Sequence, residues 1–174
     1  MSVSQEQLDY MLIMAVRNKE YSSVIDLIAA GANVNCRIKE SAITPLVECV
    51  ENFDYDIFYQ LVKNGADISE RVGPKYIENS KKISLLAYAM EKDVFHERAK
   101  ETYDLILNNG GDRDINYAPK GYASPAEIAY IKGNAPVLEL FKKYTDLKIR
   151  DEVYKRVEAK EQTKNIQTNS CKRK

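Results

Sequence analysis

The stretch SPAEIAYIKGNAPVLELF, from Ser124 to Phe141, contains a Ser-Pro start, a short apolar run, a break at Gly133 and Asn134, and a second apolar run. Serine followed by proline is typical of the first positions of a helix, and glycine is typical of a helix end. Two such short helices cannot bury a core alone. The pattern therefore predicts further copies of the same unit along the chain.

Three other stretches repeat this arrangement. Residues 43–69 begin with Ile-Thr-Pro and contain two apolar runs and the turn sequence Gly-Ala-Asp. Residues 8–35 end in Gly-Ala-Asn-Val-Asn, and Gly31 and Gly65 lie 34 positions apart. Residues 84–112 fit the same pattern if the insertion VFHER separates their two helices.

This unit resembles the ankyrin repeat, most clearly in Thr44-Pro45-Leu46 and in the turns that begin at Gly31 and Gly65. The first copy lacks Thr-Pro, the last stops after its second helix, and the family's usual histidine after leucine is absent. The resemblance implies an all-α solenoid of helix pairs with finger-like loops. We expect repeats within residues 1–144 at about 8–36, 43–70, 83–116 and 123–144, a C-terminal amphipathic helix at 145–164 that packs on the last repeat, and a disordered basic tail at 165–174.

Local chemistry explains each feature of the unit. The hydroxyls of Thr44 and Ser124 are expected to cap the first helices, and Glu127 completes a capping box with Ser124. A left-handed turn is expected at Gly31, Gly65 and Gly110. Small residues that allow close approach of the next repeat are Ala15, Cys49, Ala89 and Ala129. Residues expected to fill the space between repeats are Leu27, Ile28, Leu61, Val62, Ile106, Leu107, Leu140 and Phe141.

Composition narrows the class of protein. The 174 residues suit one domain, and 26 basic and 26 acidic residues cancel. Residues 1–141 hold 15 basic and 21 acidic groups, whereas residues 142–174 hold 11 and 5. We find no signal-peptide pattern and no apolar run of the roughly 20 residues that a membrane span needs. We therefore expect a cytoplasmic protein with reduced cysteines that is monomeric when free and does not bind membranes.

The resemblance also implies that a partner protein binds to the loops and to the exposed ends of the first helices, because stacking leaves these positions free. The predicted partner-binding residues are Arg17, Asn18, Arg37, Lys39, Glu51, Asn52, Arg71, Tyr76, Glu91, Lys92, Tyr117 and Tyr122. Tyrosine and arginine are frequent hot spots of protein interfaces. The alternative is that the loop tyrosines shield the backbone of their own loops.

The sequence offers no convincing catalytic group. His96 is the sole histidine and lies in an insertion far from any cysteine. The stretch DRDINYAPKGYA begins like a calcium loop, but Tyr117 replaces its glycine and Ala123 replaces its final glutamate. We expect no enzyme activity, no catalytic residues, no cofactor and no metal.

Three functions stay open. The favoured one is a stoichiometric inhibitor of a protein, such as an immunity protein or antitoxin. The second is a host-directed effector or adaptor that recruits a cellular protein through the same surface. The third is binding of nucleic acid through the basic C-terminal segment, which the overall charge balance disfavours.

Overall fold

A computed structural model of the chain describes residues 3–37, 43–52, 54–73, 82–92 and 98–171, the last eight of them as backbone only. The described part is mostly helical, with one short antiparallel ladder. The elements are α1 (Gln5–Arg17), α2 (Tyr21–Ala29), α3 (Pro45–Asn52), α4 (Tyr55–Lys63), β1 (Arg71–Val72), β2 (Ile83–Ser84), α5 (Leu85–Lys92), α6 (Ala99–Asn108), a 3-10 helix (Gly111–Asp114), α7 (Pro125–Ile131), α8 (Ala135–Lys142) and α9 (Asp151–Cys171).

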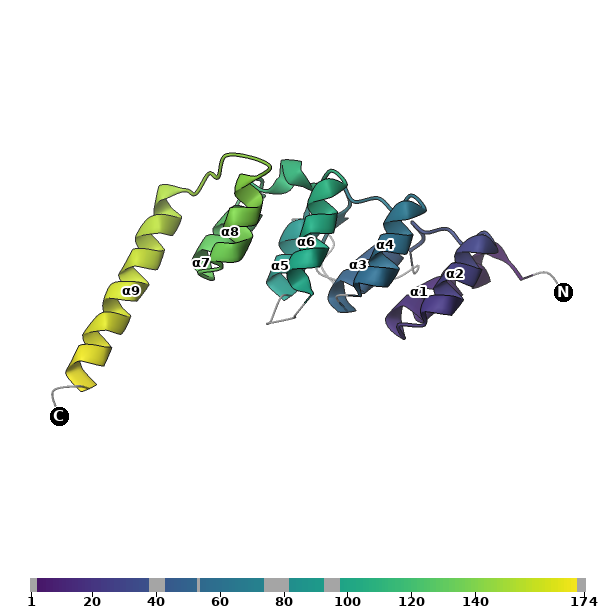
Figure 1. The fold of residues 1–174 in the computed structure, drawn as a ribbon, viewed down its shortest axis with the longest axis horizontal. Coiled ribbons are helices and arrows are strands. Elements are labelled where there is room, and N and C mark those ends of the chain that lie inside the picture. Colours follow the sequence, from purple (N-terminus) through teal and green to yellow (C-terminus); the bar gives the residue numbers. More distant parts are fainter. Residues whose placement is uncertain (1–2, 38–42, 53, 74–81, 93–97, 172–174) are drawn as a thin grey trace.

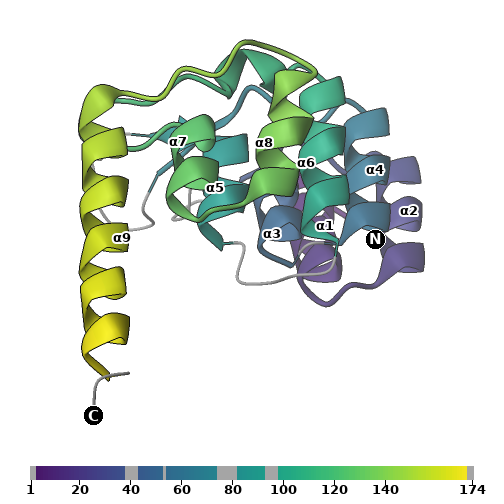
Figure 2. The same ribbon diagram turned by 60° about the vertical axis from the view of Figure 1, so that its left-hand side comes forward.

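The first eight α-helices form four pairs that follow one another along the molecule (Figure 1). Within each pair the helices pack together, as α1 with α2 and α3 with α4. The first helices α1, α3, α5 and α7 form one layer, and the second helices α2, α4, α6 and α8 form another (Figure 2). Each first helix contacts the next one, so the chain is an elongated stack of helix pairs.

The helix starts follow the predicted capping chemistry. Thr44 Oγ1 accepts a hydrogen bond from the Val47 amide at 3.3 Å, and Ser124 Oγ accepts one from the Glu127 amide at 3.3 Å. The Glu127 carboxylate in turn accepts from the Ser124 amide at 2.9 Å, which confirms the capping box. A second capping box at Ser4 starts α1. Each cap satisfies amides that the helix itself leaves unpaired.

The core lies between the helix pairs. The four small residues at equivalent positions of the first helices are all buried, as predicted. Of the eight apolar residues expected between the pairs, six are buried, and only Ile28 and Val62 are half-buried. Leu61 is completely inaccessible to solvent. Close approach at the small residues therefore lets the larger side chains of the second helices fill the remaining space.

The turns after the second helices also agree with prediction. Gly31 and Gly65 have φ angles of 95° and 90°, in the left-handed region that favours glycine. A Cβ atom at either position would meet no heavy atom within 4 Å. Glycine is thus required there by the backbone conformation alone.

The C-terminal segment differs from the expectation of a helix at 145–164 and a disordered tail at 165–174. Helix α9 begins at Asp151 and its backbone continues to Cys171, and residues 172–174 lie outside the described part. Only Val153 of its described side chains is buried, and Val157 is half-buried. The helix is therefore not amphipathic along its length, and it extends beyond the ends of α7 and α8 (Figure 1). Across the described residues, none of the helices has the length and apolarity needed to cross a membrane.

Candidate protein-interaction surface

The predicted partner-binding residues fall into two groups. One group lies at the C-terminal ends of α1, α3 and α5 and comprises Arg17, Asn18, Glu51, Asn52, Glu91 and Lys92. The other group lies in the loops before α3, α5 and α7 and comprises Arg37, Arg71, Tyr117 and Tyr122. Lys39 and Tyr76 lie outside the described residues.

Side chains of the helix-end group bridge neighbouring helix pairs. Arg17 in α1 donates to both carboxylate oxygens of Glu48 in α3, with Nε at 2.8 Å and Nη2 at 3.0 Å. Glu51 in α3 accepts a hydrogen bond from the hydroxyl of Tyr88 in α5, and Lys92 Nζ lies 3.5 Å from Glu51 Oε1. The expectation that stacking leaves Arg17, Glu51 and Lys92 free is therefore wrong.

The other three residues of the helix-end group are Asn18, Asn52 and Glu91. In the described part of the chain, no hydrogen bond of their side chains joins neighbouring helix pairs. Asn18 Nδ2 donates to Glu20 Oε1 at 3.1 Å within the same helix pair. The backbone oxygen of Asn52 accepts from Lys19 Nζ at 3.3 Å. The Glu91 side chain is exposed. A role of Asn18, Asn52 or Glu91 in partner binding stays a prediction.

The loop group also contains bridging arginines. Arg37 Nη2 lies 2.8 Å from Glu70 Oε1. Arg71 donates to both carboxylate oxygens of Asp114 in the next loop, at 2.7 and 2.8 Å. The Arg71 guanidinium also lies 5.1 Å from the ring centroid of Tyr117. Arg71 was expected to be free of structural contacts, and this expectation is wrong because it links two successive loops.

These contacts belong to a series of four buried carboxylates, each paired with a partly exposed arginine from a neighbouring segment. We call it the carboxylate–arginine series, and its pairs are Glu48 with Arg17, Glu70 with Arg37, Asp114 with Arg71, and Glu127 with Arg150. The carboxylates are 1% to 7% exposed. A buried carboxylate is costly unless it is paired and hydrogen-bonded, so each arginine has a structural task.

The Glu127 carboxylate shows the electrostatic effect of this pairing. Burial alone would raise the pKa of Glu127, because it disfavours the charged form. Hydrogen bonds from the Arg150 side chain and from the amides of Ser124 and Arg150 outweigh burial and hold the pKa below its ordinary value. Glu127 is therefore charged at neutral pH and joins the start of α7 to the segment before α9.

Polar side chains also tie the backbones of successive loops together. Asn35 Nδ2 donates to the Gly65 carbonyl at 2.9 Å, and Asn35 Oδ1 accepts from the Asp67 amide at 2.9 Å. Asn116 makes the same pair of contacts with the Asp146 carbonyl and the Lys148 amide, both at 2.9 Å. This role is not among the predictions made from the sequence, although the asparagines recur in the turns. These hydrogen bonds fix the described parts of successive loops relative to one another.

We call the loop residues Arg37, Arg71, Tyr117 and Tyr122 the loop surface. Tyr117 is 48% exposed, and Arg71 stacks over its ring. Tyr122 is half-buried against the core, and its carbonyl accepts from Arg150 Nη2 at 2.9 Å. Tyr122 thus supports the fold, whereas Tyr117 offers a ring that is both exposed and held in place.

Burial keeps the two described cysteine thiols protonated. Cys36 and Cys49 are both buried, and burial raises the pKa of Cys36 to about 12 and that of Cys49 above its ordinary value. A thiol must lose its proton to act as a nucleophile, so neither is activated. Among the described residues no three carboxylate, histidine or cysteine side chains are grouped as metal ligands. His96 lies outside the described residues.

No family model matches the chain. One curated protein, the human 2-5A-dependent ribonuclease, is 39% identical over 59 residues. The matched part is 34% of this chain and 8% of the ribonuclease, so the chain corresponds to a small part of that protein.

Proposed function

We propose that the chain is an ankyrin-repeat scaffold that binds a partner protein through the loop surface and the adjoining face of the first helices. The observation that carries this proposal is the joining of successive loops by side-chain bridges, which keeps Tyr117 and the arginines beside it in fixed positions. A fixed aromatic ring beside an arginine loses little conformational entropy on binding, and such residues are frequent interface hot spots. The partial similarity to the ribonuclease supports the repeat assignment, because that protein has ankyrin repeats.

The proposed role is non-enzymatic. Each buried carboxylate of the carboxylate–arginine series is already bound by an arginine, and the two described cysteines are protonated at neutral pH. These groups are therefore poorly suited to act as a general base or a nucleophile. The ribonuclease activity named for the similar protein is not part of this proposal, because the match covers so little of its length.

Within protein binding, the form we favour is a cytoplasmic stoichiometric inhibitor, such as an immunity protein or antitoxin. An adaptor or a host-directed effector would use the same loop surface, so these roles differ in the partner and not in the binding site. Binding of nucleic acid through the basic segment 142–174 is the competing class. It predicts an affinity that falls steeply with salt, because phosphate contacts release counterions.

Affinity capture from the native source tests the proposal with three baits, namely the wild-type chain and two single variants. The wild-type chain should retain a protein that a Tyr117→Ala bait loses, since Tyr117 is the exposed ring of the loop surface. A Tyr154→Ala bait, changed at an exposed ring of α9, is the control and should retain the same protein. Equal capture by all three baits would place the binding site elsewhere, and loss of capture by the Tyr154→Ala bait alone would place it on α9.

A further inference from the structure

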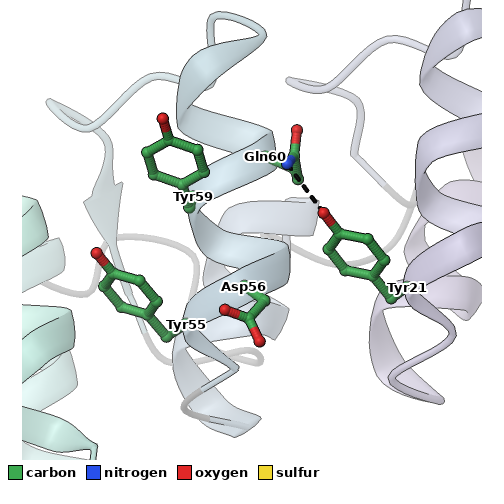
Figure 3. A pocket seen from close by; sticks show the side chains of 5 residues that line it. All are labelled: Tyr21, Tyr55, Asp56, Tyr59 and Gln60. Carbon is green, nitrogen blue, oxygen red and sulfur yellow. Dashed lines mark hydrogen bonds between the residues drawn. The ribbon is translucent and has the colours of Figure 1, made fainter.

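A hollow lies on the layer of second helices, and none of the loop-surface residues is among those that line it. It is lined by Tyr21 at the start of α2 and by Tyr55, Asp56, Tyr59 and Gln60 on α4 (Figure 3). Its volume is about 460 Å³ and it is open to solvent. We call these five residues the tyrosine hollow.

Two rings of the hollow are exposed, and one of them is held by a hydrogen bond. Tyr21 and Tyr59 are each 45% exposed, so neither is needed to fill the core between the helix pairs. Gln60 Nε2 donates to the Tyr21 hydroxyl at 3.0 Å and thereby connects α2 to α4. Tyrosine is frequent in binding surfaces, and an exposed ring that is held as Tyr21 is has little conformational freedom left to lose on binding.

One flank of the hollow already holds a cation from the chain itself. The guanidinium of Arg98, which precedes α6, lies 4.8 Å from the ring centroid of Tyr55. Arg98 Nη1 also lies 3.6 Å from Asp56 Oδ2. The aromatic face and the carboxylate are therefore spaced so that one guanidinium can contact both. The Asp56 side chain nevertheless remains 66% exposed, and it lies between Tyr55 and Tyr21 in Figure 3.

The charge around the hollow favours a cationic ligand. Residues 20–29 and 54–63, which form α2 and α4 with their N-caps, contain four carboxylates and one lysine, and Arg98 adds a second cation, so carboxylates remain in excess. Such a field attracts a basic segment and repels an acidic one. Tyrosine faces add a preference for arginine, because the planar guanidinium stacks on a ring while it pairs with a carboxylate.

We propose that the tyrosine hollow is a second docking site that binds an arginine-bearing segment of a partner protein. The guanidinium stacks on Tyr59 and pairs with Asp56, in the arrangement that Arg98 makes with Tyr55 and Asp56. The segment follows the surface between α2 and α4 toward Tyr21. This site goes beyond the proposed function, because it lies outside the loop surface and allows both surfaces to be occupied together.

A peptide titration with the full chain tests this site. The probe is a fluorescently labelled short peptide of alternating glycine and arginine, and anisotropy reports its binding. The same peptide with citrulline in place of arginine is the neutral comparison and should bind about tenfold more weakly or not at all, since it cannot pair with Asp56. The double variant Asp56→Asn/Tyr59→Ala should weaken binding of the arginine peptide by about tenfold, because it removes both the ring and the charge.

Two further variants make the result specific. Glu6→Gln/Tyr10→Ala removes one carboxylate and one exposed ring from α1, so it controls for general attraction to an acidic protein and should change affinity by about twofold or less. Tyr59→Lys, a single change at an exposed helix position, places a cation in the hollow and should abolish binding even if the double variant unfolds. Equal losses in the two double variants, unchanged binding by Tyr59→Lys, or no binding by the wild type would each overturn the proposal.

Discussion

Removal of Arg71 should destabilise the protein, and the cause should be the carboxylate that it leaves behind. Asp114 is 4% exposed, and both its oxygens accept hydrogen bonds from Arg71. Breaking a fully buried ion pair costs about 3–5 kcal/mol. The Arg71 side chain is 36% exposed, so water can partly replace it, and we expect Arg71→Ala to lower the free energy of unfolding by about 1–3 kcal/mol.

The double variant separates this pairing from other effects of the substitution. Arg71→Ala/Asp114→Ala removes the orphaned charge, so it should be less destabilised than the sum of the two single variants by about 1–2 kcal/mol. Urea unfolding of the four proteins, followed by circular dichroism, gives the coupling energy directly. If the two single-variant losses sum to within about 0.5 kcal/mol of the loss in the double variant, a structural role of the pair is refuted.

Two other predictions concern the core and the carboxylates. Leu61→Ala should lower the free energy of unfolding by about 2–5 kcal/mol in the same urea assay, because Leu61 is completely buried, and an unchanged midpoint would contradict its place between the helix pairs. The folded pKa of Glu127 is lowered, so its contribution to stability is full above the unfolded pKa and is lost as the pH falls through the folded pKa. The melting temperature should therefore fall more steeply with acidification in the wild type than in Arg150→Gln. Parallel plots of melting temperature against pH for the two proteins would show that Arg150 does not lower the pKa of Glu127.

Features that depend on near neighbours in the chain were predictable from the sequence. The caps at Thr44 and Ser124 and the left-handed Gly65 depend on contacts within a few residues, so their local pattern identifies them. The burial of Cys49 and Leu61 follows from their positions in the repeated unit. These features indicated the helix pairs and the places where they stack.

Contacts between distant residues were not predictable in this way. Arg17 and Glu48 lie 31 positions apart, and Arg71 and Asp114 lie 43 apart, so nothing in the local pattern shows that these arginines are engaged. Helix α9 begins and ends six to seven residues later than predicted, and it includes residues 165–171, whose polar composition predicts disorder. Residues 165–171 continue directly from the stretch 151–164, which is rich in the helix-favouring lysine, glutamate, glutamine and alanine, so the helix extends into a segment whose own composition does not predict it.

The hollow shows a further limit of sequence patterns. Tyr59 is next to the buried Phe58 and two positions before the buried Leu61. Its exposure depends on which side of α4 faces the neighbouring pairs. Tyr21 precedes Tyr59 by 38 positions, and only the stacking of α2 against α4 brings the two to one surface.

Calorimetric titration of the captured partner protein tests the central claim most directly, namely that the loop surface binds a protein. Tyr117→Ala should weaken the complex by roughly 2 kcal/mol, about thirtyfold in dissociation constant, if Tyr117 is a hot spot. Its melting temperature should stay close to that of the wild type, because the ring is 48% exposed. A chain truncated before Ile166 should bind like the wild type. Unchanged affinity of Tyr117→Ala together with loss of binding in the truncated chain would contradict the account and place the site on the basic C-terminal segment.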